Sequence, residues 1–138
     1  MITLRIQQTE LLARNGTLVR LVYDEDADML ELTFGENCPA RGIELTDQII
    51  LRVDPIAARA VSLTLLHFSI LAEQTVYGPR SWALASLRQM PEDARELVLH
   101  VLTTPPVSQF LKLSQLQTAP AQFMPVVYVD PQPIASYA

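Results

Sequence analysis

Cysteine and glycine are scarce in this chain of 138 residues. Cys38 is the single cysteine, so no disulfide can form within the chain, and the four glycines show none of the spacings that cradle a phosphate. The longest strongly apolar stretch, residues 60–72, is shorter than the roughly 20 residues that a membrane-spanning helix needs. The first residues show no signal-peptide pattern. We therefore predict a cytoplasmic protein that does not enter a membrane.

Charge is also sparse, and most of it is acidic. Charged residues make up 18% of the chain and hydrophobic residues 49%, with a formal net charge of −5. The basic residues are scattered singly between Arg5 and Lys112, without the basic stripe that nucleic-acid binding requires. Binding to DNA or RNA is therefore not expected. A small chain this apolar has more hydrophobic surface than it can bury alone, which predicts contact with a second copy or another protein.

Two apolar segments on either side of an acidic stretch predict a β-hairpin. Residues 18–23 and 29–34 alternate between apolar and polar side chains, which is the period of a half-buried strand. The acidic stretch between them supplies the turn. Matching the two apolar faces predicts a four-residue loop, Asp24–Ala27, and places Arg20 opposite Glu31 on the outer face.

A second strand pair follows the first. Residues 49–53 and 60–66 alternate in the same way, and the Asp-Pro pair at 54–55 starts the turn between them. A short strand is expected at 43–45, and the first strand of the chain at 2–6. This sheet is apolar on both faces, which predicts that helices or a second subunit cover it on both.

The second half of the chain changes to a helical period. Pro91, followed by two acids, suits the start of a helix, and apolar residues continue at helical spacing to Leu102. Residues 80–89 and 107–116 are expected to be helical as well. The predicted fold class is therefore α+β, with two antiparallel β-hairpins in one sheet packed against one or two C-terminal helices in two layers.

The predicted organisation is a single domain over residues 1–116, with its hairpin core at 18–68 and its helical part at 80–116. Residues 117–138 contain four prolines and a single charge, Asp130. This tail is too apolar for a disordered segment, and its prolines suit an extended arm. We expect the arm to lie on a second copy of the protein in a two-fold dimer.

The run from Tyr23 to Leu32 resembles the opening signature of an uncharacterised prokaryotic family, domain of unknown function 2283. That signature reads Tyr-Asp, two variable residues, then Ala-Asp-x-Leu-x-hydrophobic at the start of a strand, and residues 49–65 are similar to its later strand, turn and strand. The resemblance covers about residues 18–68, and it departs at Glu31, where members often have tyrosine. It implies a small layer of β-hairpins, and it implies no activity, cofactor or catalytic residue.

The acidic stretch is the sharpest candidate for a metal site. Asp24, Asp26 and Asp28 alternate like the first ligands of an EF-hand calcium loop. Met29 stands where that loop needs a glycine, and Gly35 stands where it needs a bidentate glutamate. We therefore predict a solvated turn in which aspartate side chains cap backbone N–H groups, and no metal site.

No set of residues in the sequence predicts catalysis. His67 shares the inward parity of residues 61–65 and is expected to be a hydrogen-bonded core residue. The sequence places no base beside Cys38, and the acids Glu44 and Asp54 fall at a strand edge and a turn, where ordinary surface charge is expected. We assign no catalytic residue, no metal and no cofactor.

Three aromatic residues bracket the helical part: Trp82, Tyr77 and Phe110 are expected to fill the core between sheet and helices. The leading hypothesis for function is a non-enzymatic module for protein interaction or oligomerisation, most simply a homodimer. The alternative is a small-molecule-binding protein or enzyme with a pocket near His67 and Trp82. A flat, apolar, symmetric contact favours the first hypothesis, and polar side chains converging in a concave pocket favour the second.

Overall fold

The computed structural model of the chain describes residues 6–76 and 78–130. The first strands are β1 (Ile6–Leu12), β2 (Leu18–Asp24), β3 (Met29–Phe34), β4 (Arg41–Thr46), β5 (Ile49–Asp54) and β6 (Arg59–Leu66). The later strands are β7 (Gln74–Thr75), β8 (Gly78–Pro79), β9 (Trp82–Ala83), β10 (Leu111–Ala119) and β11 (Gln122–Val129). The helical elements are α1 (Phe68–Leu71), α2 (Glu92–Leu102) and the 3₁₀ helices η1 (Ala85–Gln89) and η2 (Val107–Gln109).

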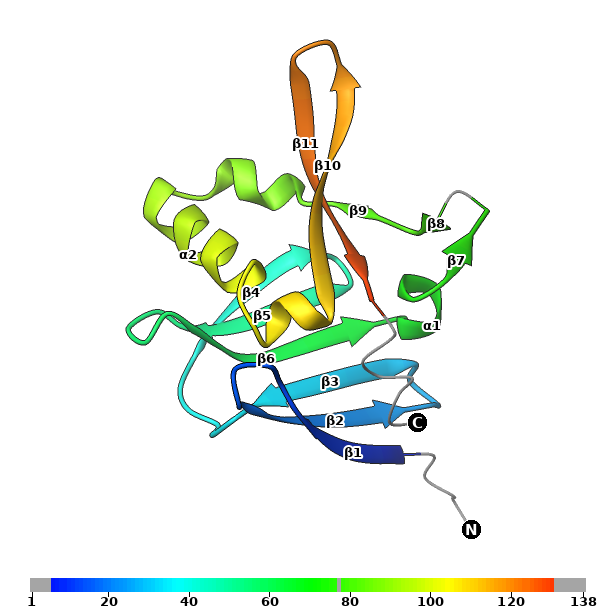
Figure 1. Cartoon of the computed structure of the whole chain (residues 1–138), viewed down its shortest axis with the longest axis vertical. Coiled ribbons are helices and arrows are strands. Elements are labelled where there is room, and N and C mark those ends of the chain that lie inside the picture. Colours follow the sequence, from blue (N-terminus) through cyan, green and yellow to red (C-terminus); the bar gives the residue numbers. More distant parts are fainter. Residues whose placement is uncertain (1–5, 77, 131–138) are drawn as a thin grey trace.

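The first six strands form one antiparallel sheet with the order β1-β2-β3-β6-β5-β4 (Figure 1). A second sheet has the order β10-β11-β9, and β7 pairs with β8 in a short ribbon. The strand pairs predicted at 18–34 and 49–66 and the helix predicted to end at Leu102 are confirmed.

The predicted fold class is wrong, because the large sheet is not packed against C-terminal helices. Within residues 6–76 and 78–130, α2 is the only α-helix longer than four residues. Residues 107–116, expected to be helical, form the short η2 turn and then enter β10. Apolar residues two positions apart, Leu111 and Leu113, suit a strand once a partner strand is present. That partner is β11, so the layer over the large sheet is mostly a second β-sheet.

The large sheet is built from two similar three-stranded meanders, β1–β2–β3 and β4–β5–β6. They meet at β3 and β6, where Leu32 directly opposes Leu63. The pairs on either side, Glu31 with Thr64 and Thr33 with Ser62, follow the same antiparallel register. An approximate two-fold axis between Leu32 and Leu63 therefore exchanges the meanders, and it places β1 and β4 at equivalent outer edges.

The main hairpin of each meander turns in the same way. The carboxylate of Asp24 accepts hydrogen bonds from the N–H groups two and three residues further on, at 3.0 and 3.2 Å. The carboxylate of Asp54 accepts the equivalent bonds at 3.0 and 3.3 Å. The residue four positions after each aspartate has a left-handed backbone, with φ of 51° at Asp28 and 52° at Ala58. The prediction that aspartate caps the acidic turn is confirmed for Asp24.

The register of the first hairpin differs from the prediction by two residues. Asp24 pairs with Met29, so the four-residue loop begins at residue 25, and Arg20 lies opposite Thr33 and not Glu31. A shift of two residues keeps each side chain on its face, so the predicted faces hold although the pairs change. The strand expected at 2–6 shares only Ile6 with β1, Ile6–Leu12, and its residues 2–5 lie outside the described residues.

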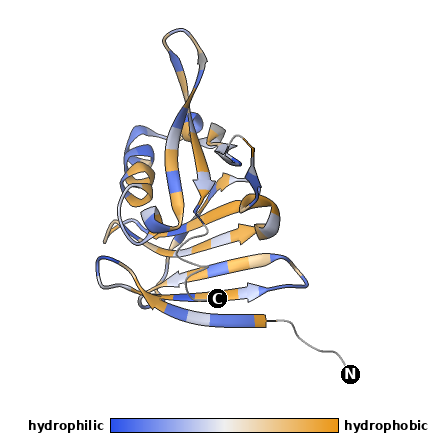
Figure 2. Cartoon of the chain, turned by 45° about the vertical axis from the view of Figure 1, so that its right-hand side comes forward, coloured by the Kyte–Doolittle hydropathy of each residue, from blue (hydrophilic) through white to orange (hydrophobic). Residues whose placement is uncertain are grey.

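The core lies between the large sheet and the layer formed by the second sheet and α2. Phe34 of β3 and Phe110 are fully buried, with ring centroids 6.3 Å apart. Val127 of β11 and Val98 of α2 are buried in the same apolar cluster. Figure 2 shows the hydrophobic residues gathered along the inner strands, with polar residues toward the outer elements.

The predicted domain boundary at residue 116 falls inside β10. Of the tail predicted as an arm, residues 117–138, the part from 122 to 129 is strand β11, which pairs along β10 of the same chain. Residues 131–138 lie outside the described residues. The apolar tail therefore fills this chain's own core at Val127, without requiring a second copy to cover it.

Candidate functional site

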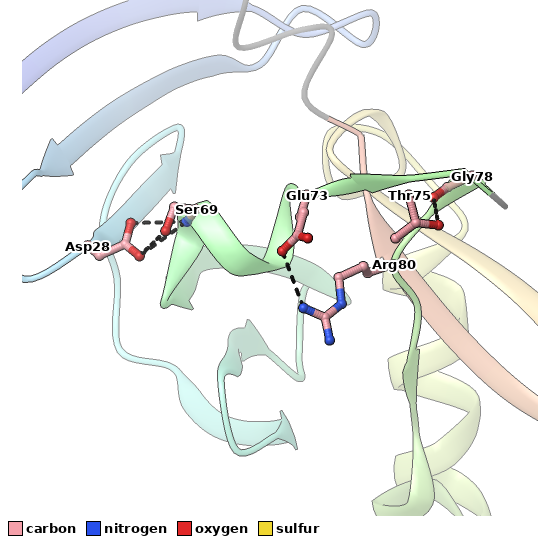
Figure 3. Close-up of polar contacts among 6 residues, drawn as sticks. All are labelled: Asp28, Ser69, Glu73, Thr75, Gly78 and Arg80. Atoms are coloured by element: carbon pink, nitrogen blue, oxygen red, sulfur yellow. Dashed lines mark hydrogen bonds and ion pairs between the residues drawn. The ribbon is translucent and has the colours of Figure 1, made fainter.

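The most connected polar side chain of the acidic turn is Asp28. Its carboxylate accepts the hydroxyl of Tyr23 at 2.8 Å, the backbone N–H of Ser69 at 3.0 Å and the hydroxyl of Ser69 at 2.5 Å. Figure 3 shows Asp28 reaching from the β2–β3 turn to the start of α1. Asp28 therefore fastens the hairpin turn to the segment that follows β6.

These contacts shift the pKa of both acidic groups. The hydrogen bond to Asp28, helped by burial, raises the pKa of Tyr23 to about 12. Burial alone would raise the pKa of the Asp28 carboxyl, but the hydrogen bonds from Ser69 and Tyr23 outweigh it and hold that pKa below its ordinary value. A carboxylate with a lowered pKa and saturated acceptors is a weak base, which suits a structural clamp better than proton transfer.

The acidic residues of the turn do not converge as metal ligands. Asp24 uses Oδ1 to cap the turn, and Asp28 faces Ser69. Within the described ranges, no three His, Cys, Asp or Glu side chains form a group able to hold a metal ion. The turn is therefore explained by its internal hydrogen bonds.

His67 is not the core residue that its parity predicted. The chain leaves the strand at His67, where φ is 55°, and the exposed side chain stands at the start of α1. Trp82 is half-buried in β9 and packs against the core, and Phe110 is buried as predicted. Tyr77 lies outside the described residues. His67 is therefore in solvent and Trp82 is half-buried against the core, and the small-molecule pocket of the alternative hypothesis stays a prediction.

Cys38 lies beside the guanidinium of Arg59. Arg59 donates to Cys38 Sγ at 3.3 Å, to the carbonyl of Phe34 at 3.0 Å and to the carbonyl of Glu36 at 2.7 Å. These bonds fasten the loop after β3 to the start of β6. Arg59 and Cys38 therefore have a structural role, because their contacts hold these two segments together.

The most unusual surface is the outer half of the β10–β11 hairpin, residues 114–125, which we name the hairpin arm. The arm extends beyond α2 and the rest of the chain (Figure 1). No charged side chain occurs between Leu113 and Val129. Leu116 is 53% exposed and Phe123 is 52% exposed. An uncharged projection with large apolar side chains in solvent is typical of a contact surface.

The sequence builds the arm by local rules. Pro120 followed by Ala121, whose φ is 64°, matches the central positions of a type II turn. The hydrogen bond from Asp130 N to the carbonyl of Phe110 sets the phase of the ladder, so the backbone nitrogen of Pro125 points away from β10. Proline costs no hydrogen bond there, and its carbonyl accepts the N–H of Leu84 at 3.0 Å.

A hollow of about 340 Å³ lies at the root of the arm. Leu87, Leu99 and Leu113 give it an apolar floor, and Arg88 and Arg95 stand at its side. Arg95 is held by the carbonyls of Leu87 and Met90, at 3.0 and 3.1 Å. This hollow extends the apolar surface of the arm and adds positive charge to it.

A larger hollow, of about 550 Å³, separates β4 from the start of α2. Ile43, Val53 and Leu97 line its apolar part, and Arg41 and Asp93 stand among its lining residues. Its volume is within the range of small-molecule sites. Glu44, expected as ordinary surface charge at a strand edge, also lines the hollow, so two carboxylates and one guanidinium supply its polar contacts.

Comparisons with family models, curated proteins and solved structures find no match for this chain. The resemblance to domain of unknown function 2283 therefore stays a prediction. Within the described ranges, no helix is both long enough and apolar enough to cross a membrane.

Sequence reasoning missed the hairpin arm, although two local signals mark it. Leu111, Leu113 and the valines at 127 and 129 have the period of strands, and the Pro-Ala pair at 120–121 lies midway between them. The many prolines of the tail argued against a strand. The phase of the ladder at Pro125, which only the paired structure defines, removes that objection.

Proposed function

We propose that this protein is a non-enzymatic interaction module that self-associates, and that the hairpin arm is its contact surface for a protein partner. The observation that carries the proposal is the exposure of Leu116 and Phe123 on an uncharged projection. A two-stranded hairpin is marginally stable by itself, and one with exposed apolar residues gains from being covered. A partner's apolar surface would provide that cover.

The residues at the root of the hairpin arm indicate which kind of protein partner would bind there. Arg88 is exposed beside the apolar floor of the hollow. An acidic side chain next to apolar residues would therefore complement the surface formed by the arm and its root. On the hairpin, Phe123 lies on the face that carries Gln115 and Pro125 of the hollow, and Leu116 lies on the opposite face. Such a partner would therefore wrap around the arm, covering Phe123 beside the hollow and Leu116 on the other face, with its acid at the rim.

The candidate reactive groups support a module that is not an enzyme. The Asp28 carboxylate is used by Tyr23 and Ser69, and Arg59 is used by backbone carbonyls and Cys38. Each of these clusters ties two segments of the chain together. An interaction role explains why the arm is exposed, and an enzymatic role does not.

The test compares binding by an arm variant with binding by a control variant whose substitution lies on an exposed turn away from the arm. Leu116→Glu with Phe123→Glu places charge on the arm, and Ile56→Glu places it on the β5–β6 turn, where Ile56 is 96% exposed. Proteins captured from the native cell by the wild-type chain are purified and titrated against each variant. We expect the arm variant to lose at least about tenfold in affinity and the control to keep it. Equal binding by all three proteins would refute the proposal.

A second candidate function is small-molecule binding in the hollow between β4 and α2. The observation that favours it is the volume of about 550 Å³ with Arg41 and Asp93 among its lining residues. The test is a fragment screen monitored by NMR. Shifts confined to the amides of Gly42 and Ala94 at micromolar fragment concentrations would support this function, and no binding below millimolar concentrations would oppose it. A cytoplasmic location stays a prediction under either function.

A further inference from the structure

The two edges of the large sheet are treated differently by the rest of the chain. The edge strand β4 has a bulge between Glu44 and Thr46, and η1 lies against it, with the hydroxyl of Ser86 donating to the carbonyl of Leu45 at 3.2 Å. The equivalent strand β1 pairs with β2 without a break from Ile6 to Leu12. It contains no proline or lysine and no bulge, which are the usual means of protecting an edge.

The backbone of β1 offers a regular set of hydrogen-bonding groups at this edge. The N–H of Ala13 donates to the carbonyl of Thr17 at 2.8 Å, which sets the phase of the β1–β2 ladder. Residues an even number of positions before Ala13, among them Thr9, therefore direct their backbone groups toward β2. The alternate residues, Ile6, Gln8, Glu10 and Leu12, direct theirs to the edge of the sheet, where β1 has no partner strand within the part of the chain that the structure describes.

The residues of β1 are apolar at the ends of the strand and polar in the middle (Figure 2). Ile6 is 44% exposed, Leu12 is 68% exposed, and Leu18, which lies opposite Leu12 on β2, is 42% exposed. All three lie on the outer face of the sheet, because Leu11 is on the buried face. The edge thus carries two apolar sites that flank a polar centre.

We infer that β1 pairs with β1 of a second copy, antiparallel, about a two-fold axis that passes through Thr9. In this register Gln8 lies opposite Glu10 of the second copy, and Ile6 lies opposite Leu12 of the second copy. The four residues that direct their backbone groups outward then meet one another, so every free N–H and carbonyl of β1 finds a partner. The inference takes self-association from the proposed function, but the surface is not the hairpin arm.

This register is the one that matches both the backbone and the side chains. A shift of one residue would join the buried face of one copy to the outer face of the other. A shift of two residues would place Gln8 or Glu10 opposite itself and leave two residues unpaired at one end of each strand. With the two-fold axis at Thr9, Leu12 and Leu18 of one copy lie beside Ile6 of the second copy, and this happens at each end of the contact. The second copy is therefore an occupant that fits this edge along its full length.

Disulfide trapping tests the position of the axis. Thr9 of one copy would lie opposite Thr9 of the second copy, in a pair that exchanges no backbone hydrogen bonds. The Cα atoms of such a pair are about 4.5 Å apart, which is within reach of a disulfide. On a Cys38→Ser background, Thr9→Cys is expected to form a covalent dimer under mild oxidation. The matched control Gln7→Cys should remain monomeric on a non-reducing gel, because the two positions would lie about 13 Å apart. Trapping by Gln7→Cys, or by neither variant, overturns the inference.

Charge substitutions at Gln8 test the register without oxidation. In the dimer, position 8 of each copy lies opposite Glu10 of the other copy. Gln8→Lys would therefore place two pairs of opposite charges across the contact and tighten the dimer, and Gln8→Glu would place two pairs of like charges there and loosen it. We expect the two dissociation constants to differ by at least about fivefold in sedimentation at low salt, in a range near tens of micromolar because the contact is small. Equal constants, a reversed order, or a monomeric full chain at about 200 μM would refute this interface.

The arm variant separates this inference from the proposed function. Leu116→Glu with Phe123→Glu is expected to keep the dimer mass, because the arm belongs to the second sheet and β1 is an edge strand of the large sheet. A dimer that survives this substitution and is broken by Gln8→Glu supports the β1 interface. A dimer that the arm variant breaks and Gln8→Glu does not would overturn it, while leaving the hairpin arm as a contact surface.

Discussion

Replacing Asp28 with alanine is expected to lower the free energy of unfolding by about 2–4 kcal/mol. The substitution removes the acceptor for the hydroxyl of Tyr23 and for the N–H and hydroxyl of Ser69. A hydrogen bond to a charged group contributes about 1.5–3 kcal/mol when well buried, and the partial exposure of Asp28 argues for the lower part of that range. The alanine variant can keep the turn, because Ala58 adopts the same left-handed φ in the equivalent turn.

The loss is expected to depend on pH in a defined direction. The pKa of Asp28 is lowered by folding, so its contribution is present above the ordinary carboxyl value of about 4 and is lost as pH falls through the lower folded value. The pKa of Tyr23 is raised to about 12, so its contribution is present below about pH 10 and is lost as pH rises toward 12. The gap between wild type and Asp28→Ala should therefore be widest between pH 5 and 9.

Urea unfolding followed by circular dichroism measures the gap at pH 7 and at pH 3. Ser69→Ala should remove part of the same stability, and the double variant should lose less than the sum, because both substitutions break the same bonds. Asp26→Ala is the matched control in the same turn, and its cost should stay within about 0.5 kcal/mol because Asp26 is exposed. A cost for Asp28→Ala below about 0.5 kcal/mol, or one unchanged at pH 3, would refute the clamp.

Three further experiments test the packing, register and turn geometry of the large sheet. Leu32→Ala should cost about 2–5 kcal/mol because Leu32 is fully buried, whereas Glu31→Ala should stay within about 0.5 kcal/mol, as chemical denaturation will measure. A double-mutant cycle on Arg20 and Glu10, 3.4 Å apart and exposed, should give a coupling under about 1 kcal/mol that shrinks with salt, and the cycle on Arg20 and Glu31 should give none. Ala58→Gly should raise the melting temperature by stabilising the chain by about 1 kcal/mol, since φ is 52° there; a lower melting temperature would contradict the turn geometry.

The register of the first hairpin shows where reasoning from the sequence stops. The predicted and observed pairings put the same side chains of β2 and β3 on the same faces, because they differ by two residues. Hydrophobic matching cannot separate such pairings. The difference is made by Asp24, which caps the turn while still paired with Met29, and by Asp28, whose backbone turns left-handed to meet Ser69 on a distant segment.

The hairpin arm was missed for a related reason. Residues 107–116 are compatible with a helix or a strand when taken alone, and the choice depends on a partner strand that lies eight or more residues further along the chain. The exposure of Leu116 cannot be inferred from its type either, because Leu113 on the same strand packs against the core. The candidate contact surface therefore emerges only when the second sheet is assembled over the first.

The sequence by itself determined the strands at 18–34 and 49–66, the α2 helix and the aspartate-capped turns. These are encoded by local side-chain period and by hydrogen bonds between near neighbours. The tertiary structure alone decided that β10 and β11 cover the large sheet, that His67 faces solvent, and that β4 is covered while β1 has a partner strand on one side only among residues 6–76 and 78–130. Each of these depends on contacts between segments far apart in the chain, which no local pattern specifies.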